Sequence, residues 1–120
     1  MPEPIGQLSM VMLNVDDMDK ACAFYANTMG LKLKFRDGTR WAAFDAGGIT
    51  LALAGGSERA SAAVALNFKV ANVDEALARV TADGGRREGQ TATSAHDIRA
   101  AIRDLDGHVI NLYSPVPKSG

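Results

Sequence analysis

The chain of 120 residues contains one cysteine, Cys22, and only two histidines, His96 and His108. A single cysteine cannot form an intrachain disulfide or a thiolate metal cluster, and it fits a reducing compartment. We interpret Cys22 as a small packing residue of a helix. Two histidines are too few to build the usual site for a divalent metal.

The sequence also lacks an excess of charge of one sign and any long hydrophobic run. Its formal net charge is -1, and neither a basic stripe nor an aromatic-basic cluster indicates a nucleic-acid partner. No apolar stretch approaches the length that spans a bilayer, and the first residues, MPEP, do not begin a secretion signal. We therefore expect a cytoplasmic protein with no nucleic-acid or membrane partner.

What is present indicates one domain with a real hydrophobic core, since 47% of the residues are hydrophobic. A β-compatible run at residues 8–15 precedes Asp17, which is a good N-cap for a helix that stops at Gly30. Strand-like segments with period-two alternation follow at residues 32–36, 40–45 and 49–54. The expected packing stripe of the helix consists of Met18, Cys22, Tyr25 and Met29.

The second half repeats this order after a small, polar linker. Residues 64–70 alternate cleanly, and Asn72 with Glu75 forms a capping-box pattern that opens a second helix with Val73, Leu77 and Val80 on its stripe. Further strands are expected at residues 90–93, 98–103 and 109–113. Because VDDMDKA at 15–21 matches VANVDEA at 70–76, we predict a single α+β domain of two βαβββ modules. The modules cover about 5–54 and 64–115, and the linker about 55–63.

The closing strand carries the most informative polar residue. Asp106-Gly107 reads as a tight turn, and the strand after it places Ile110 and Leu112 on one face. Asn111 shares the other face with Val109 and Tyr113, away from the side that packs on a helix.

The order of these pieces resembles the vicinal oxygen chelate superfamily, which includes glyoxalase I, extradiol dioxygenases, fosfomycin resistance enzymes and bleomycin-binding proteins. The likeness is carried by Val15-x-Asp17, Phe24-Tyr25, Met29-Gly30-Leu31 and Asp104-x-Asp106-Gly107. It implies that each module curls its strands into half of a barrel-like cleft, with its helix on the convex side. It also implies a homodimer, whose modules can swap through the linker.

The same resemblance assigns metal-ligand slots to Met10, Ala52, Ala65 and Asn111. Metal-dependent members hold His or Gln, Glu, His and Glu there, because a divalent cation needs nitrogen and carboxylate ligands. A thioether, two methyl groups and one neutral amide do not meet that need, so we expect no metal and no other cofactor. A metal enzyme with ligands elsewhere in the chain is the remaining alternative.

A cleft without a metal leaves room for an organic ligand. Trp41 is either an aromatic plate for a flat ligand or plain core, and Arg99 and Arg103 are either ligand contacts or solvated edge charges. His96 lies in an expected loop with either a proton-transfer role or none, and His108 is read as a surface or packing residue. The predicted ligand-binding residues are Met10, Met12, Trp41, Thr50, Ala52, Ala65, Asn67, Arg99, Asn111 and Tyr113.

Two functions remain open at this point. The leading hypothesis is a metal-independent protein that sequesters an antibiotic or another partly aromatic natural product. The alternative is a metal-free enzyme of the same fold, a cyclase, isomerase or hydrolase, with His96, Asn111 and Tyr113 as the catalytic residues. The sequence does not distinguish binding from turnover.

Overall fold

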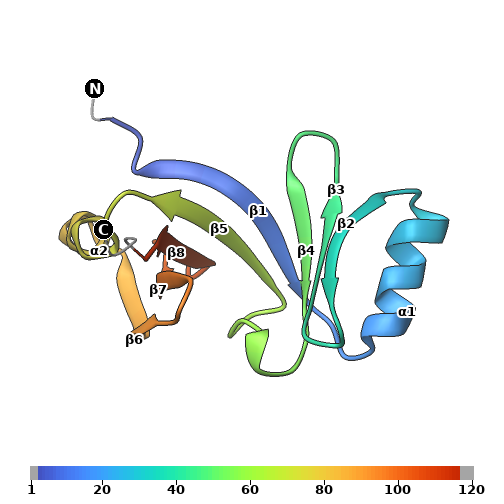
Figure 1. Ribbon diagram of the computed structural model, residues 1–120. Helices are drawn as coiled ribbons and strands as arrows, with labels where there is room; N and C mark the ends of the chain where they lie inside the picture. Colours follow the sequence, from blue (N-terminus) through green and yellow to red (C-terminus); the bar gives the residue numbers. More distant parts are fainter. Residues whose placement is uncertain (1–2, 117–120) are drawn as a thin grey trace. The chain divides into compact units, whose positions relative to one another are not determined.

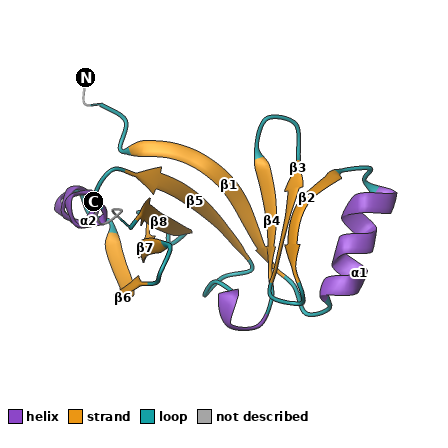
Figure 2. Ribbon diagram, viewed as in Figure 1, coloured by secondary structure: helices purple, strands orange, loops and turns teal. Residues whose placement is uncertain are grey.

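The computed structural model describes residues 3–116 and divides the chain into two compact units. We call residues 9–65 the N-terminal unit and residues 3–8 with 66–116 the C-terminal unit. Each unit joins strands of one sheet to a helix that packs on one face (Figures 1 and 2). The predicted α+β class is confirmed. Within the described residues, no helix has the length and apolar character needed to cross a membrane.

The N-terminal unit has the strand order β2-β3-β4-β1. Its first strand, β1 (Gly6–Asn14), runs parallel to β4 (Thr50–Ala54). Between β4 and β2 (Lys32–Asp37) lies β3 (Trp41–Asp45), antiparallel to both. A short 3₁₀ turn, η2 (Gly56–Glu58), follows β4. The chain order is strand, helix and three strands, as the sequence predicts.

The helix of this unit, α1 (Met18–Ala23), starts where its cap residue predicts. The side chain of Asp17 accepts a hydrogen bond from the backbone N–H of Lys20 at 3.1 Å. The chain then continues as a π-helical turn, η1 (Phe24–Thr28), in which Met29 N–H bonds to the carbonyl oxygen of Phe24. This wider turn rotates Met29 off the packing stripe, and Met29 is 56% exposed. The prediction that Met29 packs with the stripe is therefore wrong.

The core of the N-terminal unit lies between α1 and its sheet. Phe44 and Leu53 are fully buried and pack with Met18 and Cys22 of the helix. Cys22 is thus a packing residue, as predicted. We call the face of each sheet that is turned away from its helix the open face of that unit.

The C-terminal unit repeats the topology, with the order β5-β8-β7-β6. Its strands are β5 (Val64–Val70), β6 (Arg86–Thr93), β7 (Asp97–Arg103) and β8 (Val109–Pro115), with β5 parallel to β8 and the other pairs antiparallel. The first residue of β6 lies four positions before the predicted start at residue 90, because Arg86 already pairs with Arg103.

The helix of the C-terminal unit, α2 (Val73–Ala82), begins after Asn72, whose side chain accepts from Glu75 N–H at 3.0 Å. Val73 and Leu77 are buried against Ile102 and Leu112 of the sheet. This packing defines the open face as the side of β8 that carries Asn111.

Candidate functional site

The open face of the C-terminal unit is centred on two amides. Asn111 lies opposite Asn67 of β5, and Asn111 Nδ2 donates to Asn67 Oδ1 at 2.9 Å. Asn67 is buried, whereas Asn111 is half-buried. A polar residue on β8 therefore meets another polar residue rather than the core, and the two side chains hold each other in place.

Arg99 and Arg103 both lie on this face. The sequence alone did not show which of them would do so. Arg99 is opposite Tyr113 and Arg103 is opposite Val109. The guanidinium of Arg103 is fixed by Glu88 Oε1, 2.6 Å from Nε, and by the carbonyl oxygen of Gly107, 2.8 Å from Nη1. Arg103 therefore braces the sheet, while the more exposed Arg99 lies in the row of Tyr113.

The open face of the N-terminal unit brings together five of the predicted ligand-binding residues. The register pairs Met10 with Thr50 and Met12 with Ala52, and it places Trp41 on the neighbouring strand β3. Met12 and Ala52 are buried, whereas Met10, Thr50 and Trp41 are half-buried. Ala65 lies on β5, two residues before Asn67, and is also buried.

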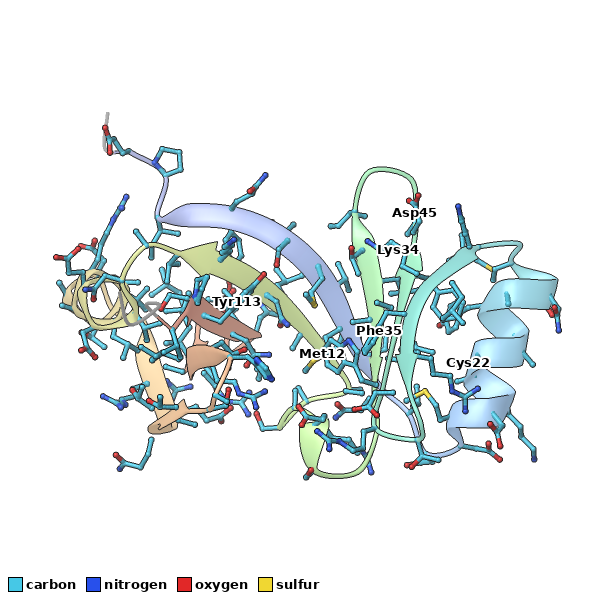
Figure 3. The ribbon with its side chains drawn as sticks, in the orientation of Figure 1. Met12, Cys22, Lys34, Phe35, Asp45 and Tyr113 are labelled. Carbon is cyan, nitrogen blue, oxygen red and sulfur yellow. The ribbon has the colours of Figure 1, made fainter. Side chains whose placement is uncertain are left out.

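Sequence reasoning did not single out Lys34, and it missed Phe35 because β2 does not alternate regularly. Leu33 pairs with Phe44, but Phe35 pairs with Ala43, so the strand contains a β-bulge. The extra residue moves Phe35 to the open face, where it is 58% exposed. Figure 3 shows Lys34 and Phe35 on the side of the sheet away from α1 and Cys22. No residue in this stretch signals the bulge.

The bulge also changes the position of Arg36. An unbroken alternation would place Arg36 on the same face as Lys34, but the guanidinium of Arg36 instead binds the carboxylate of Asp19 on α1. That carboxylate raises the pKa of Arg36, so the guanidinium stays protonated. The ion pair lies on the helix side of the sheet, in agreement with the bulged register.

Lys34 reaches across β3 to the last strand of its module. Its Nζ donates to Thr50 Oγ1 on β4. Asp45, which is directly opposite Thr50 on β3, accepts a hydrogen bond from Gly47 N–H at 3.0 Å. That backbone bond lowers the pKa of Asp45, with smaller contributions from Gly48 and from the charges of Lys34 and Lys32. The open face therefore carries a cation and a carboxylate at neutral pH.

The four slots in which metal-dependent relatives hold ligands do not fit a divalent cation. Met10 pairs with Thr50, Ala52 pairs with Met12, and Asn111 is bonded to Asn67. Across residues 3–116, no three His, Cys, Asp or Glu side chains gather closely enough to hold a metal ion. The donor set offers one amide and one thioether, which are poor ligands for a hard or borderline cation.

The two histidines lie in loops. His96 is exposed between β6 and β7, where its backbone N–H donates to Ser94 Oγ at 3.2 Å. His108 is exposed in the turn between β7 and β8, as the surface interpretation predicts, and its Nδ1 lies 3.0 Å from Asp104 Oδ2. The role of His96 in proton transfer stays a prediction.

The β7–β8 turn makes the fold sensitive to acid. The backbone N–H of His108, followed by its ring and by the N–H of Asp106, holds the pKa of Asp104 below its usual value. A depressed carboxyl pKa stabilises the fold above the unfolded pKa of about 3.9, and this contribution is lost as pH falls through the folded pKa.

We therefore expect the carboxyl carbon of Asp104 to titrate below pH 3.9 by NMR. Asp104→Asn should remove this part of the acid dependence and leave stability near neutral pH lower than in the wild type. Asp106, whose side chain is exposed in the same turn, is the control position. A carboxyl of Asp104 that titrates at or above about pH 3.9, the value of an unfolded chain, would contradict the assignment.

A surface hollow of about 600 Å³ lies at the end of β1 and the segment after η2. It is lined by Asn14, Asp16 and residues 59–63, and it contains none of the predicted ligand-binding residues. The charges at its rim compensate each other, since Arg59 Nη1 lies 3.3 Å from Asp16 Oδ1. The hollow forms where the chain leaves the first module, after η2. There the side chain of Asn14 is hydrogen-bonded to the backbone N–H and carbonyl oxygen of Ala60.

Comparison with known proteins agrees with this architecture. The chain is 36% identical over 113 residues to an uncharacterized protein of Mycolicibacterium smegmatis, covering 93% of this chain and 97% of that one. The crystal structure of a glyoxalase/bleomycin resistance protein/dioxygenase superfamily member from Vibrio splendidus matches with a TM-score of 0.67 and 16% identity, over 90% of this chain and 99% of that one.

A third similar structure is methylmalonyl-CoA epimerase from Mycobacterium tuberculosis, with a TM-score of 0.64 and 21% identity, over 92% of this chain and 88% of that one. At these identities the solved structures support the fold alone. Residues 7–112 match the family profile of the Glyoxalase/Bleomycin resistance protein/Dioxygenase superfamily. The resemblance drawn from the sequence is thereby confirmed, and the chain belongs to that superfamily.

Proposed function

We propose that this protein binds a small, partly aromatic organic molecule directly, without a metal ion, and releases it unchanged. The observation that carries the proposal is the amide pair of Asn111 and Asn67. By the resemblance, Asn111 occupies a slot that metal-dependent relatives give to a carboxylate ligand. An amide can both donate and accept hydrogen bonds, which suits the carbonyl, amide or hydroxyl of an organic ligand better than a cation.

The open face of the N-terminal unit, taken by itself, also has side chains that suit a small organic ligand. Trp41 and Phe35 offer aromatic surface there, and Met10 offers an adaptable apolar contact. Aromatic and apolar contacts with a few placed polar groups are typical of small-molecule sites. Sequestration of an antibiotic or a related natural product is the biological role that we propose.

The proposal predicts stoichiometric binding that survives metal removal. Protein treated with a chelator should bind a compound from a library of aromatic natural products as tightly as untreated protein, by calorimetry. Asn111→Leu should weaken that binding about tenfold, because one polar contact contributes about 1.4 kcal/mol. Mass spectrometry of the released compound should show its original mass and chromatographic retention.

Three results would overturn this proposal. One is stoichiometric Zn, Ni, Mn or Fe in gently purified protein, coupled to loss of binding when it is removed. The second is a chemically altered compound after release, and the third is binding that Asn111→Leu leaves unchanged. Ala101→Ser, at the position of β7 opposite Asn111, is the control for a polar change on the same face.

A metal-free enzyme is the second candidate, favoured by the row that pairs Arg99 with Tyr113. A guanidinium beside a phenol can orient a carbonyl and stabilise negative charge that develops on it. In that case His96, Asn111 and Tyr113 are the proposed catalytic residues. A bell-shaped dependence of rate on pH that disappears in His96→Ala would support the enzyme, and turnover that is unchanged in this variant would exclude His96 as the base.

A further inference from the structure

We infer that the ligand of the N-terminal open face is a flat aromatic carboxylate, and that Lys34 with Thr50 binds its charged group. This inference rests on the proposed binding function and names the class of ligand. It follows from the bulge in β2, from the contact of Lys34 with Thr50 and from the spacing of the strands.

The bulge places a cation and an exposed ring next to each other. In an unbroken strand, Phe35 would point toward α1 and Arg36 toward the open face. The shifted register instead puts Phe35 opposite Ala43 on the open face, beside Lys34. Bulges recur next to binding sites because they redirect a side chain at the cost of one unpaired residue.

The contact between Lys34 and Thr50 leaves two donors that converge. An ammonium group carries three N–H donors, and Thr50 Oγ1 accepts one of them. Since the hydroxyl oxygen is an acceptor in this contact, its own proton is directed elsewhere and can be donated. A second ammonium proton and this hydroxyl proton lie close enough to serve the two oxygens of one carboxylate.

The strand spacing sets the size of the ligand. Phe35 on β2 and Thr50 on β4 are separated by two inter-strand steps, roughly 10 Å, and by two residues along the strands, roughly 7 Å, which gives a diagonal of about 12 Å. The residue between them on β3, opposite Phe35, is Ala43. Its side chain is small and half-buried, so it leaves space above the sheet. A fused two-ring acid spans this distance, with its rings beside Phe35 and its carboxylate at Lys34.

Asp45 should repel the bound anion. A substitution of Asp45 should therefore change the affinity for an acid in the opposite direction to a substitution of Lys34. The carboxylate of Asp45 lies opposite Thr50, and the bond from Gly47 N–H keeps it ionised at neutral pH. It should therefore repel a bound carboxylate through a few ångströms of partly solvated space. Asp45→Asn keeps the acceptor for Gly47 and removes the charge, so it should strengthen binding of an acid alone.

The experiment compares 2-naphthoate with 2-naphthamide, which differ in charge but not in ring size. Calorimetry should show the acid binding about tenfold more tightly to the wild type, and the indole N–H signal of Trp41, the single tryptophan, should shift with both. Lys34→Gln and Thr50→Val should each reduce this preference, and Asp45→Asn should increase it. Lys20→Gln, an exposed position on α1 on the other side of this sheet, should keep it.

Each outcome separates this inference from the proposed function. Equal affinity for the acid and the amide, no binding of either at millimolar concentration, or a preference that Lys34→Gln leaves intact would overturn the inference. If a neutral compound still binds and is released unchanged, the proposed function stands without it. A preference lost in Lys34→Gln, together with a chemically altered compound, would support the anion site and refute simple sequestration.

Discussion

Phe44→Ala is expected to lower the free energy of unfolding by about 3–5 kcal/mol, the range for deleting a buried aromatic ring. Phe44 is fully buried on β3, its ring lies 6.1 Å from that of Tyr25, and it packs with Met18 and Cys22. A domain of this size has a total stability of about 5–15 kcal/mol, so the variant should unfold at a much lower urea concentration.

Phe35→Ala is the matched control, because it removes the same ring from the neighbouring strand. Phe35 is 58% exposed on the open face, so its loss should change stability by less than about 0.5 kcal/mol. Urea unfolding followed by far-UV circular dichroism measures both variants. If Phe35→Ala proved as costly as Phe44→Ala, Phe35 would lie in the core and the bulge in β2 would be wrong.

The contrast between these two residues marks the limit of what the sequence could predict. The caps Asp17 and Asn72 specify helix starts through a local bond, and the strict alternation of residues 109–113 specifies the faces of β8. The bulge and the π-helical turn each add one residue to a hydrogen-bonding register. Local preference does not encode such shifts, because packing contacts such as the ion pair of Arg36 with Asp19 decide them.

The candidate site, like the fold, could be predicted from the sequence only in part. The internal repeat placed Asn111 on the open face, and the register confirms that position while adding Asn67 as its bonded partner. Lys34 and Asp45 were absent from the predicted wall, although alternation alone places both on this face, because their relation to Thr50 on β4 depends on how the strands pair. The polar chemistry of the N-terminal open face therefore became visible only with the register in hand.

Asn14→Ala is expected to destabilise the fold by about 2–4 kcal/mol, since it removes three hydrogen bonds from one part-buried side chain. Asn14 Nδ2 donates to the carbonyl oxygens of Ala60 and Ala62 at 2.8 and 3.0 Å, and Asn14 Oδ1 accepts from Ala60 N–H at 2.7 Å. The side chain thus takes the place of a strand partner for the segment that leaves η2. Alanine would leave the N–H and both carbonyl groups without these bonds.

Two further variants distinguish the contribution of these hydrogen bonds of Asn14 from that of the surface charges around them. Asn14→Asp keeps the acceptor but turns a carboxylate toward two carbonyl oxygens, so it should destabilise at least as much as alanine at pH 7. Arg59→Gln removes the exposed ion pair with Asp16 and should cost less than about 1 kcal/mol. Hydrogen exchange should show the amide of Ala60 losing protection in both Asn14 variants and keeping it in Arg59→Gln. Equal stability of Asn14→Ala and Arg59→Gln would mean that the segment holds its path without Asn14, through contacts such as the bond from Asn14 N–H to Ala63, which needs no side chain.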